Sequence, residues 1–305
     1  VDGAEVKNAN FGNITPLTSF PVNIGAFIFS SWGNRFNLGL IDELGVYNRA
    51  LSAAEILQIF TGGAPVQVGP PAGLVAWWPG EGNLNDIVNG NDGASGTVMA
   101  YGTGKVGSGF SFNGPDNGND YITVPASSSL DVGTGGGFTI EGWVNVGFVN
   151  PYGAAPIIEW GTLAGDGLQL WVESPDNKLY ANLKDINGVN HQIQEDVGSV
   201  TLNQFHHVAL TYDKASGNAY LYVDGAEVKR ANFGNITALT SVPVNIGAFI
   251  LSGCGSRFNQ GIIDDLSVYS RALSAVEIKN IFLDDSNGKC QFFQPSLSAG
   301  PWTGW

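Results

Sequence analysis

Short segments in which hydrophobic and polar residues alternate recur along the chain from Gly73 onward. In the segment GLQLWVE, Leu168, Leu170 and Val172 occupy every second position, and KLYANLK repeats this pattern. Side chains of a strand point alternately to its two faces, so the pattern predicts strands with one buried face. Together with short apolar runs, it predicts strands over residues 109–113, 121–124, 138–146, 155–161, 168–173, 178–183, 192–195 and 207–221. Many short strands between glycine-rich turns, with almost no helix, predict an all-β sandwich.

The segment Val223–Phe282 is present twice in the chain. Val1–Phe60 matches it without a gap at an offset of 222 positions, and about 45 of the 60 positions are identical. About 150 residues of strand-rich sequence precede the second copy, whereas nothing precedes the first. The repeat therefore predicts one complete module and the C-terminal part of another.

Each copy is predicted to end in a short helix. Ser52 with Glu55, and Ser274 with Glu277, have the S-x-x-E spacing of a capping box. The intervening segment TGGAPVQVGPPA is rich in glycine and proline, as is typical of a linker. The predicted organisation is a truncated module at 1–62, a linker at 63–72, a complete module at 73–283 and a tail at 284–305.

Charge and composition exclude several classes of partner. The chain has 13 Lys and Arg against 27 Asp and Glu, and a formal net charge of −14. Nucleic-acid binding requires stripes of Lys and Arg, so we expect no nucleic-acid partner. No apolar run is long enough to span a bilayer, so we expect no membrane insertion. Tandem β modules with few lysines indicate an exported protein.

Five motifs in order carry a family resemblance. They are GLVAWWPGEGNLNDIVNGNDG (73–93), FTIEGWV (138–144), FHHVALTYD (205–213), LYVDG (221–225) and IDDLSVYSRALSAVEI (263–278). Together they resemble the laminin G-like modules of the concanavalin A-like lectin/glucanase superfamily, over 73–283 and, in part, over 1–62. The resemblance implies a concanavalin A-like jelly-roll β-sandwich with one short C-terminal helix per copy. It also implies a carbohydrate-binding or adhesive module that bacteria secrete or display on the cell surface, often with a structural calcium ion at the rim.

The strand GIIDDLSVY contains two adjacent carboxylates. Period two places Asp264 on the inward face with Leu266 and Val268, and Asp265 on the outward face. A buried carboxylate requires a partner, and two alternatives are open. One partner is Arg271. The other is a calcium ion shared with the acidic loop EGNLNDIVNGNDG, because calcium takes six to eight oxygen ligands. The candidate metal ligands are Asp86, Asn91, Asp92 and Asp264.

A candidate glycan surface lies on the polar face of the two alternating strands. An aromatic ring can stack on the CH face of a sugar while amides and a carboxylate bind its hydroxyl groups. The candidate ligand-binding residues are Trp171, Gln169, Glu173, Tyr180, Asn182, Trp160 and His191. The alternative is that Trp171 and Tyr180 fill the sandwich or lie beneath its loops.

We do not expect an enzyme. Glucanases of the superfamily carry acid and nucleophile carboxylates that alternate on one strand. Here the acidic pair in IDDLS is adjacent, and Glu141 has no acidic neighbour two positions away. The pair His206–His207 has no Ser or Cys partner motif.

The chain has two cysteines, Cys254 and Cys290, and no metal-binding cysteine spacing. The sequence leaves two alternatives open: a disulfide between Cys254 and Cys290, or two free thiols.

The predicted function is a non-catalytic carbohydrate-binding or adhesive module for a polysaccharide, with a structural calcium. The alternative is a structural repeat of an extracellular adhesin or filament. In that alternative, residues 1–60 replace their near-identical copy in another chain, since exchange of equivalent elements is a low-cost route to oligomers. A glycan hydrolase of the same fold is the third possibility.

Overall fold

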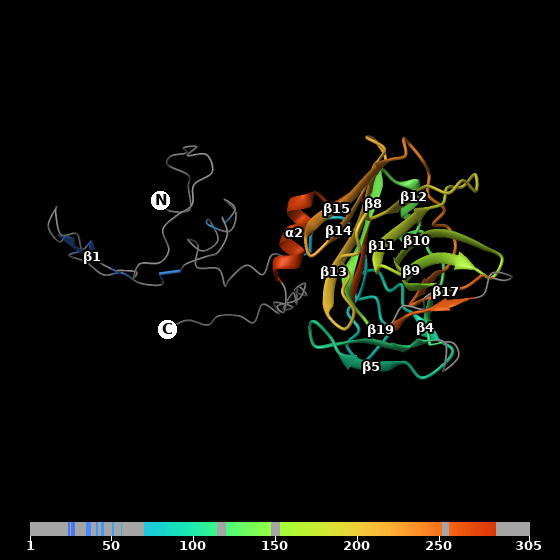
Figure 1. Cartoon of the computed structure of the whole chain (residues 1–305), viewed down its shortest axis with the longest axis horizontal. Helices are drawn as coiled ribbons and strands as arrows, with labels where there is room; N and C mark the ends of the chain where they lie inside the picture. Colours follow the sequence, from blue (N-terminus) through green and yellow to red (C-terminus); the bar gives the residue numbers. More distant parts are fainter. Residues whose placement is uncertain are drawn as a thin grey trace, which may run out of the picture. The chain divides into compact units, whose positions relative to one another are not determined.

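The computed structural model describes residues 70–114, 120–147, 153–251 and 256–284, and isolated positions between 24 and 56. The chain divides into two units, Val1–Gln67 and Val68–Trp305. In the first unit, β1 (Ala26–Phe27) and β2 (Arg35–Phe36) form an antiparallel pair. Strands β3 to β19 and helix α2 belong to the second unit (Figure 1). The linker prediction, most of the first repeat copy and the tail lie outside the described residues.

One layer of the second unit is an antiparallel seven-stranded sheet. Its strands, in spatial order, are β12 (Gln192–Gln194), β11 (Lys178–Leu183), β10 (Gly165–Glu173), β9 (Ala154–Thr162), β16 (Val244–Ile246), β7 (Ile122–Val124) and β4 (Ala94–Ser95). Strands far apart in sequence, such as β9 and β16, are direct neighbours in this sheet.

The second layer is an antiparallel eight-stranded sheet. Its main order is β15 (Ala226–Asn232), β14 (Asn218–Val223), β13 (Phe205–Asp213), β8 (Gly137–Val146), β19 (Gln260–Tyr269), β6 (Ser108–Asn113) and β5 (Ala100–Thr103). Strand β3 (Leu74–Trp78) also pairs with β19. The 3-10 helix η2 (Val132–Thr134) precedes β8, and the short strands β17 (Ala248–Phe249) and β18 (Arg257–Phe258) pair separately.

The two sheets enclose one hydrophobic core. Leu168, Leu170 and Val172 of β10 are fully buried in it, as the alternating pattern predicts, and Ile140 and Val208 reach it from the other sheet. The predicted all-β sandwich is confirmed. Burial of these apolar side chains is the main force that holds the sheets together.

Helix α2 (Ala275–Asp284) packs on the outer face of the eight-stranded sheet (Figure 1). Its predicted capping box is confirmed, because Glu277 N donates to Ser274 Oγ (3.3 Å) and Ser274 N donates to Glu277 Oε2 (2.8 Å). Hydrogen bonds from Arg271, and then from Ser274, lower the pKa of Glu277 to about 2. Ile278 and Ile281 bury the apolar side of the helix against the sheet.

A tight turn connects β14 to β15. Asp224 and Gly225 both have positive φ, at 52° and 70°, which is the backbone of a two-residue type I′ hairpin. A Cβ at Gly225 would lie 2.7 Å from Lys279 Cδ, so the close approach of α2 also requires glycine here. The turn therefore places the outer strand β15 beside the helix.

Candidate functional site

Polar side chains form a continuous row on the outer face of the seven-stranded sheet. The cross-strand register gives the order Gln192, Asn182, Gln169, Glu159, Asn245 and Thr123. The residues that flank the row along each strand, such as Leu170 and Ile246, point into the core. We call these six residues the polar row.

Glu159, in the middle of the polar row, is fully buried. Burial away from water raises its pKa from the ordinary 4.5 to about 8; the hydrogen bond from Ile250 N opposes this rise, and the negative charge of Asp166 adds to it. Glu159 Oε2 accepts that bond at 3.2 Å, while Oε1 has no hydrogen-bond partner within the described residues. The side chain is therefore a neutral carboxylic acid at pH 7.

An aromatic cluster of Trp171, Tyr180 and Phe249 lies beside the polar row. The Trp171 ring centroid is 5.6 Å from that of Tyr180 and 5.1 Å from that of Phe249, which meets it edge to face. Trp171 is 8% exposed, and its Nε1 has no acceptor in the part of the chain that the structure describes. Burial, and then the charge of Glu173, raise the pKa of Tyr180 to about 12, so its hydroxyl stays protonated.

The charged groups around this face are paired. Lys184 Nζ lies 2.7 Å from Asp166 Oδ1, and Gln169 Nε2 donates to Asp166 Oδ2 (3.1 Å). Gln194 donates a hydrogen bond to Glu173. Burial raises the pKa of Glu173 above its ordinary value, and the nearby positive charge of Arg257 opposes this rise. The face therefore offers hydrogen-bonding groups and rings without a dominant charge.

The predicted glycan residues are only partly brought together. Gln169, Trp171, Glu173, Tyr180 and Asn182 do share this outer face, but Trp171 and Tyr180 are nearly buried beneath neighbouring side chains.

Two further candidates lie elsewhere. The prediction for Trp160 is wrong, because it occupies the position after outward-facing Glu159 and is buried in the core, where Nε1 donates to Leu130 O (3.1 Å). His191 lies in the loop between β11 and β12, with Nε2 3.3 Å from Asp185 Oδ2. Sequence reasoning missed Glu159 and Phe249; the signal for Glu159 was a lone acid within the apolar run AAPIIEWG.

The prediction that the Asp264 side chain points into the core is wrong. Asp264 pairs with Trp143 of β8 and Ser267 pairs with Glu141, so β19 has one residue more than β8 between these pairs. Asp265, with φ of 52°, is the extra residue of this bulge, and it moves Asp264 to the outer face. There Asp264 Oδ2 accepts from Val106 N at 2.9 Å.

The prediction for Asp265 differs: its outward placement agrees with the structure, because it accepts a hydrogen bond (2.7 Å) from Nε1 of Trp77, which faces outward between the core residues Ala76 and Trp78. Asp265 is nearly buried on that outer face. The expectation for Arg271 is wrong. Arg271 is not the partner of Asp264; its guanidinium binds Glu277, with Nη2 2.5 Å from Oε1, and Nε donates to Ala72 O (2.7 Å). The capping box explains this difference, because Glu277 of the box holds the Arg271 guanidinium.

The acidic loop before β4 is organised by Asp86 through hydrogen bonds of its own. Asp86 Oδ1 accepts from Trp77 N and Val88 N, and Oδ2 accepts from Asn89 N, Asn91 N and Asn91 Nδ2, at 2.7–3.2 Å. Asn91 Oδ1 in turn accepts from two serine hydroxyls, and Asp92 Oδ1 accepts from Asp86 N (2.9 Å). These bonds fix the loop against β3.

The four candidate metal ligands do not form a cage in this arrangement. The described residues contain no group of three or more Asp, Glu, His or Cys side chains placed to hold a metal ion. Asp86 already accepts five hydrogen bonds, and Asp264 is bonded to a different turn. Calcium binding by the protein stays a prediction. The predicted disulfide of Cys254 and Cys290 lies outside the described residues.

Comparison with known families places this fold. A family model described as the concanavalin A-like lectin/glucanases superfamily, of laminin G-like type, matches residues 1–57 and 116–279. The chain belongs to this superfamily. No curated protein matches the chain by sequence.

Solved structures share this fold at low sequence identity. The binding domain of Paraclostridial Mosquitocidal Protein 1 matches with a TM-score of 0.56 and 18% identity, covering 69% of this chain and 52% of that chain. Domain 4 of AbnA, a GH43 extracellular arabinanase from Geobacillus stearothermophilus in complex with arabinotriose, gives 0.52 and 18%, covering 68% and 97%. Botulinum neurotoxin type C, whose cell entry depends on two ganglioside molecules, gives 0.54 and 16%, covering 70% and 51%. The chain spans about half the length of the toxin chains it matches.

The family description also names glucanases, and the module contains buried acid and base side chains at Glu141, His206 and His207. His207 Nε2 lies 3.0 Å from Glu141 Oε2, and both side chains are fully buried on the outer face of the eight-stranded sheet. Tyr269 hydroxyl donates to Glu141 Oε1 (3.3 Å), and His206 Nδ1 lies 2.9 Å from Asp224 Oδ2. These contacts join strands to one another.

No helix in the described ranges is long and apolar enough to cross a membrane.

Proposed function

We propose that the complete module binds a neutral polysaccharide on the outer face of the seven-stranded sheet, as a non-catalytic part of a larger secreted or cell-surface protein. One observation carries the proposal. Glu159 Oε1, Trp171 Nε1 and Asn182 Oδ1 are buried without a hydrogen-bond partner in the described part of the chain, and all three lie on this face. A buried polar atom without a partner costs about 1–3 kcal/mol, so three on one face favour a ligand that supplies the missing bonds.

The chemistry of these atoms fits sugar hydroxyl groups. The indole Nε1 of Trp171 only donates, Asn182 Oδ1 accepts, and the neutral carboxyl of Glu159 can do either. A hydroxyl group both donates and accepts, so it can satisfy each of them. Lys184 is paired with Asp166, and Arg257 lies near Glu173, so the described cations of this face each have a carboxylate nearby, which disfavours an acidic sugar.

Binding requires the cover of the aromatic cluster to move. Phe249 of β17 meets the Trp171 ring edge to face, and Arg257 of β18 lies over the Phe249 ring at 5.6 Å. In the bound state, a sugar ring takes the place of Phe249 on Trp171. This exchanges one apolar contact for another and opens the polar row to hydroxyl groups.

The arabinanase domain supports the choice of ligand class, because that domain is in complex with arabinotriose and the match covers 97% of it. Its identity of 18% leaves the sugar itself open. Arabinotriose, xylotriose, cellotriose and mannotriose therefore serve as probes of neutral glycan binding.

Alanine in place of Trp171 is expected to weaken binding of the trisaccharide probe about tenfold or more. Loss of the stacking surface removes on the order of 1.5 kcal/mol or more of binding free energy. Isothermal titration calorimetry of the full chain gives the affinity, and thermal unfolding by circular dichroism checks the fold. Leu163→Ala, at an exposed position in the turn between β9 and β10, serves as the control and should bind as the wild type does.

Two binding results would contradict the proposal. One is that none of the four trisaccharides binds the wild-type chain. The other is that the folded Trp171→Ala variant binds with unchanged affinity. Release of new reducing ends from a bound probe would instead make the module a hydrolase.

The repeat favours a second candidate function, self-association by exchange. Residues 1–60 match 223–282 at about 45 of 60 positions, so one chain offers a near copy of a segment that completes the sandwich of another. Light scattering is then expected to give a mass above that of a 32.1 kDa monomer. A monomeric mass at all concentrations would rule out self-association and leave carbohydrate binding as the remaining candidate function.

A further inference from the structure

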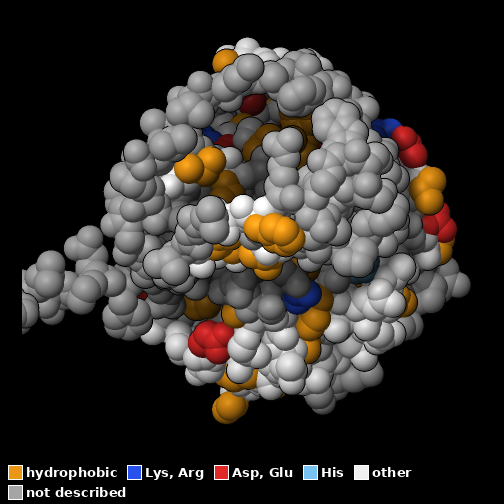
Figure 2. Space-filling model, turned by 90° about the vertical axis from the view of Figure 1, so that its left-hand side faces the viewer, with side chains coloured by type: hydrophobic (Ala, Val, Ile, Leu, Met, Phe, Trp, Pro, Cys, Tyr) orange, Lys and Arg blue, Asp and Glu red, His pale blue; other side chains and the backbone are white. Residues whose placement is uncertain are grey.

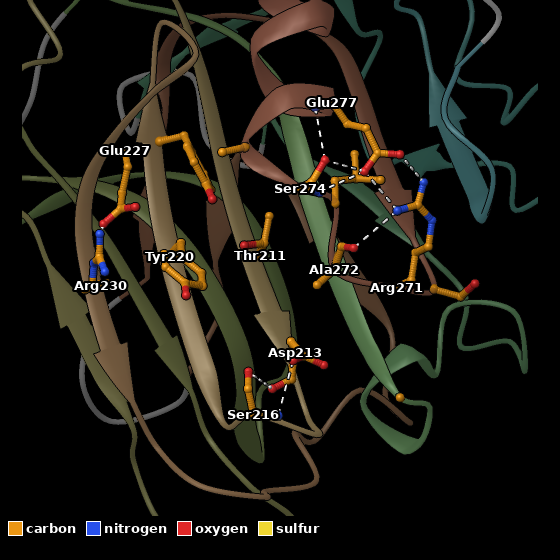
Figure 3. Close-up of a pocket in the computed structure, with 15 residues that line it drawn as sticks. Thr211, Asp213, Ser216, Tyr220, Glu227, Arg230, Arg271, Ala272, Ser274 and Glu277 are labelled. Carbon is orange, nitrogen blue, oxygen red and sulfur yellow. Dashed lines mark hydrogen bonds and ion pairs between the residues drawn. The ribbon is translucent and has the colours of Figure 1, made fainter. Parts of the chain in front are cut away.

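A groove of about 670 Å³ lies on the outer face of the eight-stranded sheet. One side is formed by β13 and β14, and the other by the segment that leads into α2 (Figure 3). Thr211 and Tyr220 face Ala272 and Ser274 across it, and the turn at Asp213 closes one end. Pockets for small ligands commonly have volumes of this size. The polar row is on the opposite sheet, so this groove is a separate site.

Two tyrosines form the aromatic part of the groove. Tyr220 and Tyr222 occupy outward positions two residues apart on β14, and their ring centroids are 6.3 Å apart. Tyr222 is buried against the base of α2, whereas Tyr220 is half-buried beside the opening. Arg230 of β15 lies over the Tyr220 ring, with Cζ 5.8 Å from its centroid. This arrangement provides an apolar surface that hydrogen-bonding groups border.

Four of the five charged residues that line the groove are paired with one another. Arg230 Nε lies 2.6 Å from Glu227 Oε1, and Arg271 Nη2 lies 2.5 Å from Glu277 Oε1, at the two sides of the groove. Asp213 accepts hydrogen bonds from Ala215 N and Ser216 N in its own turn. A phosphate or nucleic acid would have to compete with a carboxylate for each guanidinium, which disfavours anionic ligands.

Hydrogen-bonding capacity remains after this pairing. A guanidinium has five N–H donors, and within the described residues Arg230 uses only Nε. The tyrosine hydroxyls can donate and accept, and carboxylate oxygens accept more than one bond each. The groove thus combines a ring face, spare donors and spare acceptors with nearly balanced charge, which is the chemistry that a neutral polyhydroxylated ligand requires.

We propose that this groove is a second carbohydrate site, which takes a neutral oligosaccharide of one to three sugar units with Tyr220 as its stacking platform. With sites on opposite sheets, one module can hold two separate polysaccharide chains. Attachment at both sites then strengthens retention on a polymer beyond either affinity alone. The groove does not depend on the polar row, so either site can exist without the other.

The test is an amide chemical-shift titration of the isotope-labelled full chain with millimolar arabinotriose, xylotriose, cellotriose and mannotriose. We expect at least one probe to shift amides of Thr211, Tyr220 and Leu273. In calorimetry, Tyr220→Ala and Arg230→Ala should each weaken this binding several-fold or more. Tyr220→Phe keeps the ring and should retain most of it. Arg230 is mostly exposed, so its variant tests the site without a risk to folding.

The outcomes separate the two sites. Shifts at Thr211 and Tyr220 that persist in Trp171→Ala establish the groove, whether or not the polar row binds. Binding that Trp171→Ala removes and Tyr220→Ala leaves intact overturns the groove and retains the proposed function. The absence of any shift at these three amides with all four probes also overturns the groove.

Discussion

Glutamine in place of Glu159 is expected to stabilise the module by roughly 3–5 kcal/mol above pH 8 and to change little at pH 5. The native pKa of Glu159 is about 8, against the ordinary 4.5. Between these two values the unfolded chain has released the proton and the native state keeps it, so wild-type stability falls as pH rises. Above pH 8 the native state holds a buried carboxylate, whereas glutamine is neutral at every pH.

Urea unfolding of both proteins at pH 5, 7 and 8.5 measures this effect. The difference between the two free energies of unfolding cancels the titration of all other groups. Glu227→Gln, at an exposed position on β15, is the control for the replacement of a carboxylate by an amide. If the free energies of unfolding of the wild type and of Glu159→Gln differ by the same amount at all three pH values, then the pKa of Glu159 is not raised and water reaches its carboxyl group.

The second large effect is expected at Asp86. Alanine at this position removes the side chain that accepts five hydrogen bonds. Two of the donors that lose their acceptor are the buried Trp77 N and Asn91 N. Hydrogen bonds to a charged group contribute more than neutral ones, and orphaned buried donors are costly, so we expect a loss of about 3–5 kcal/mol. Urea unfolding measures it. Asp92→Ala, which removes a single bond to Asp86 N, is the matched control and should cost about 1 kcal/mol.

The same pair of variants tests the predicted calcium ion. If Asp86 acts through its hydrogen bonds alone, its substitution costs the same free energy with calcium and with a chelator. If the wild type loses stability on chelation and Asp86→Ala does not respond, then Asp86 is a metal ligand. In that case the loop has a second arrangement in which its oxygens turn from the backbone to the ion.

Period-two alternation predicted the strands well because one face of each sheet must be buried. It placed Gln169, Trp171 and Tyr180 together on the outer face, and the capping box located the start of α2. These features depend on residues close in sequence, or on pairing between adjacent strands. The alternation could not show that Phe249, which is far away in sequence, covers Trp171.

The errors arose where the backbone departs from a regular strand. Asp264 was assigned to the core because the extra residue at Asp265 leaves no mark in the hydrophobic pattern. Glu159 was missed because its function depends on burial and on β16 beside it, which is nearly ninety positions later in the chain. The outer groove depends on β15 and α2, and its residues are polar positions that look like ordinary surface in the sequence. On the side of the molecule that Figure 2 shows, described side chains of both charges lie among hydrophobic ones.

The bulge at Asp265 affects how relatives of this protein should be compared. A relative without the extra residue would need a one-residue gap within the motif IDDLS to keep equivalent positions inside and outside the sandwich. An ungapped alignment would match an outward carboxylate of one protein with a core residue of the other. Alignments of this strand should therefore be anchored on the inward pair Leu266 and Val268, and the acidic column should be assigned only after the bulge has been located.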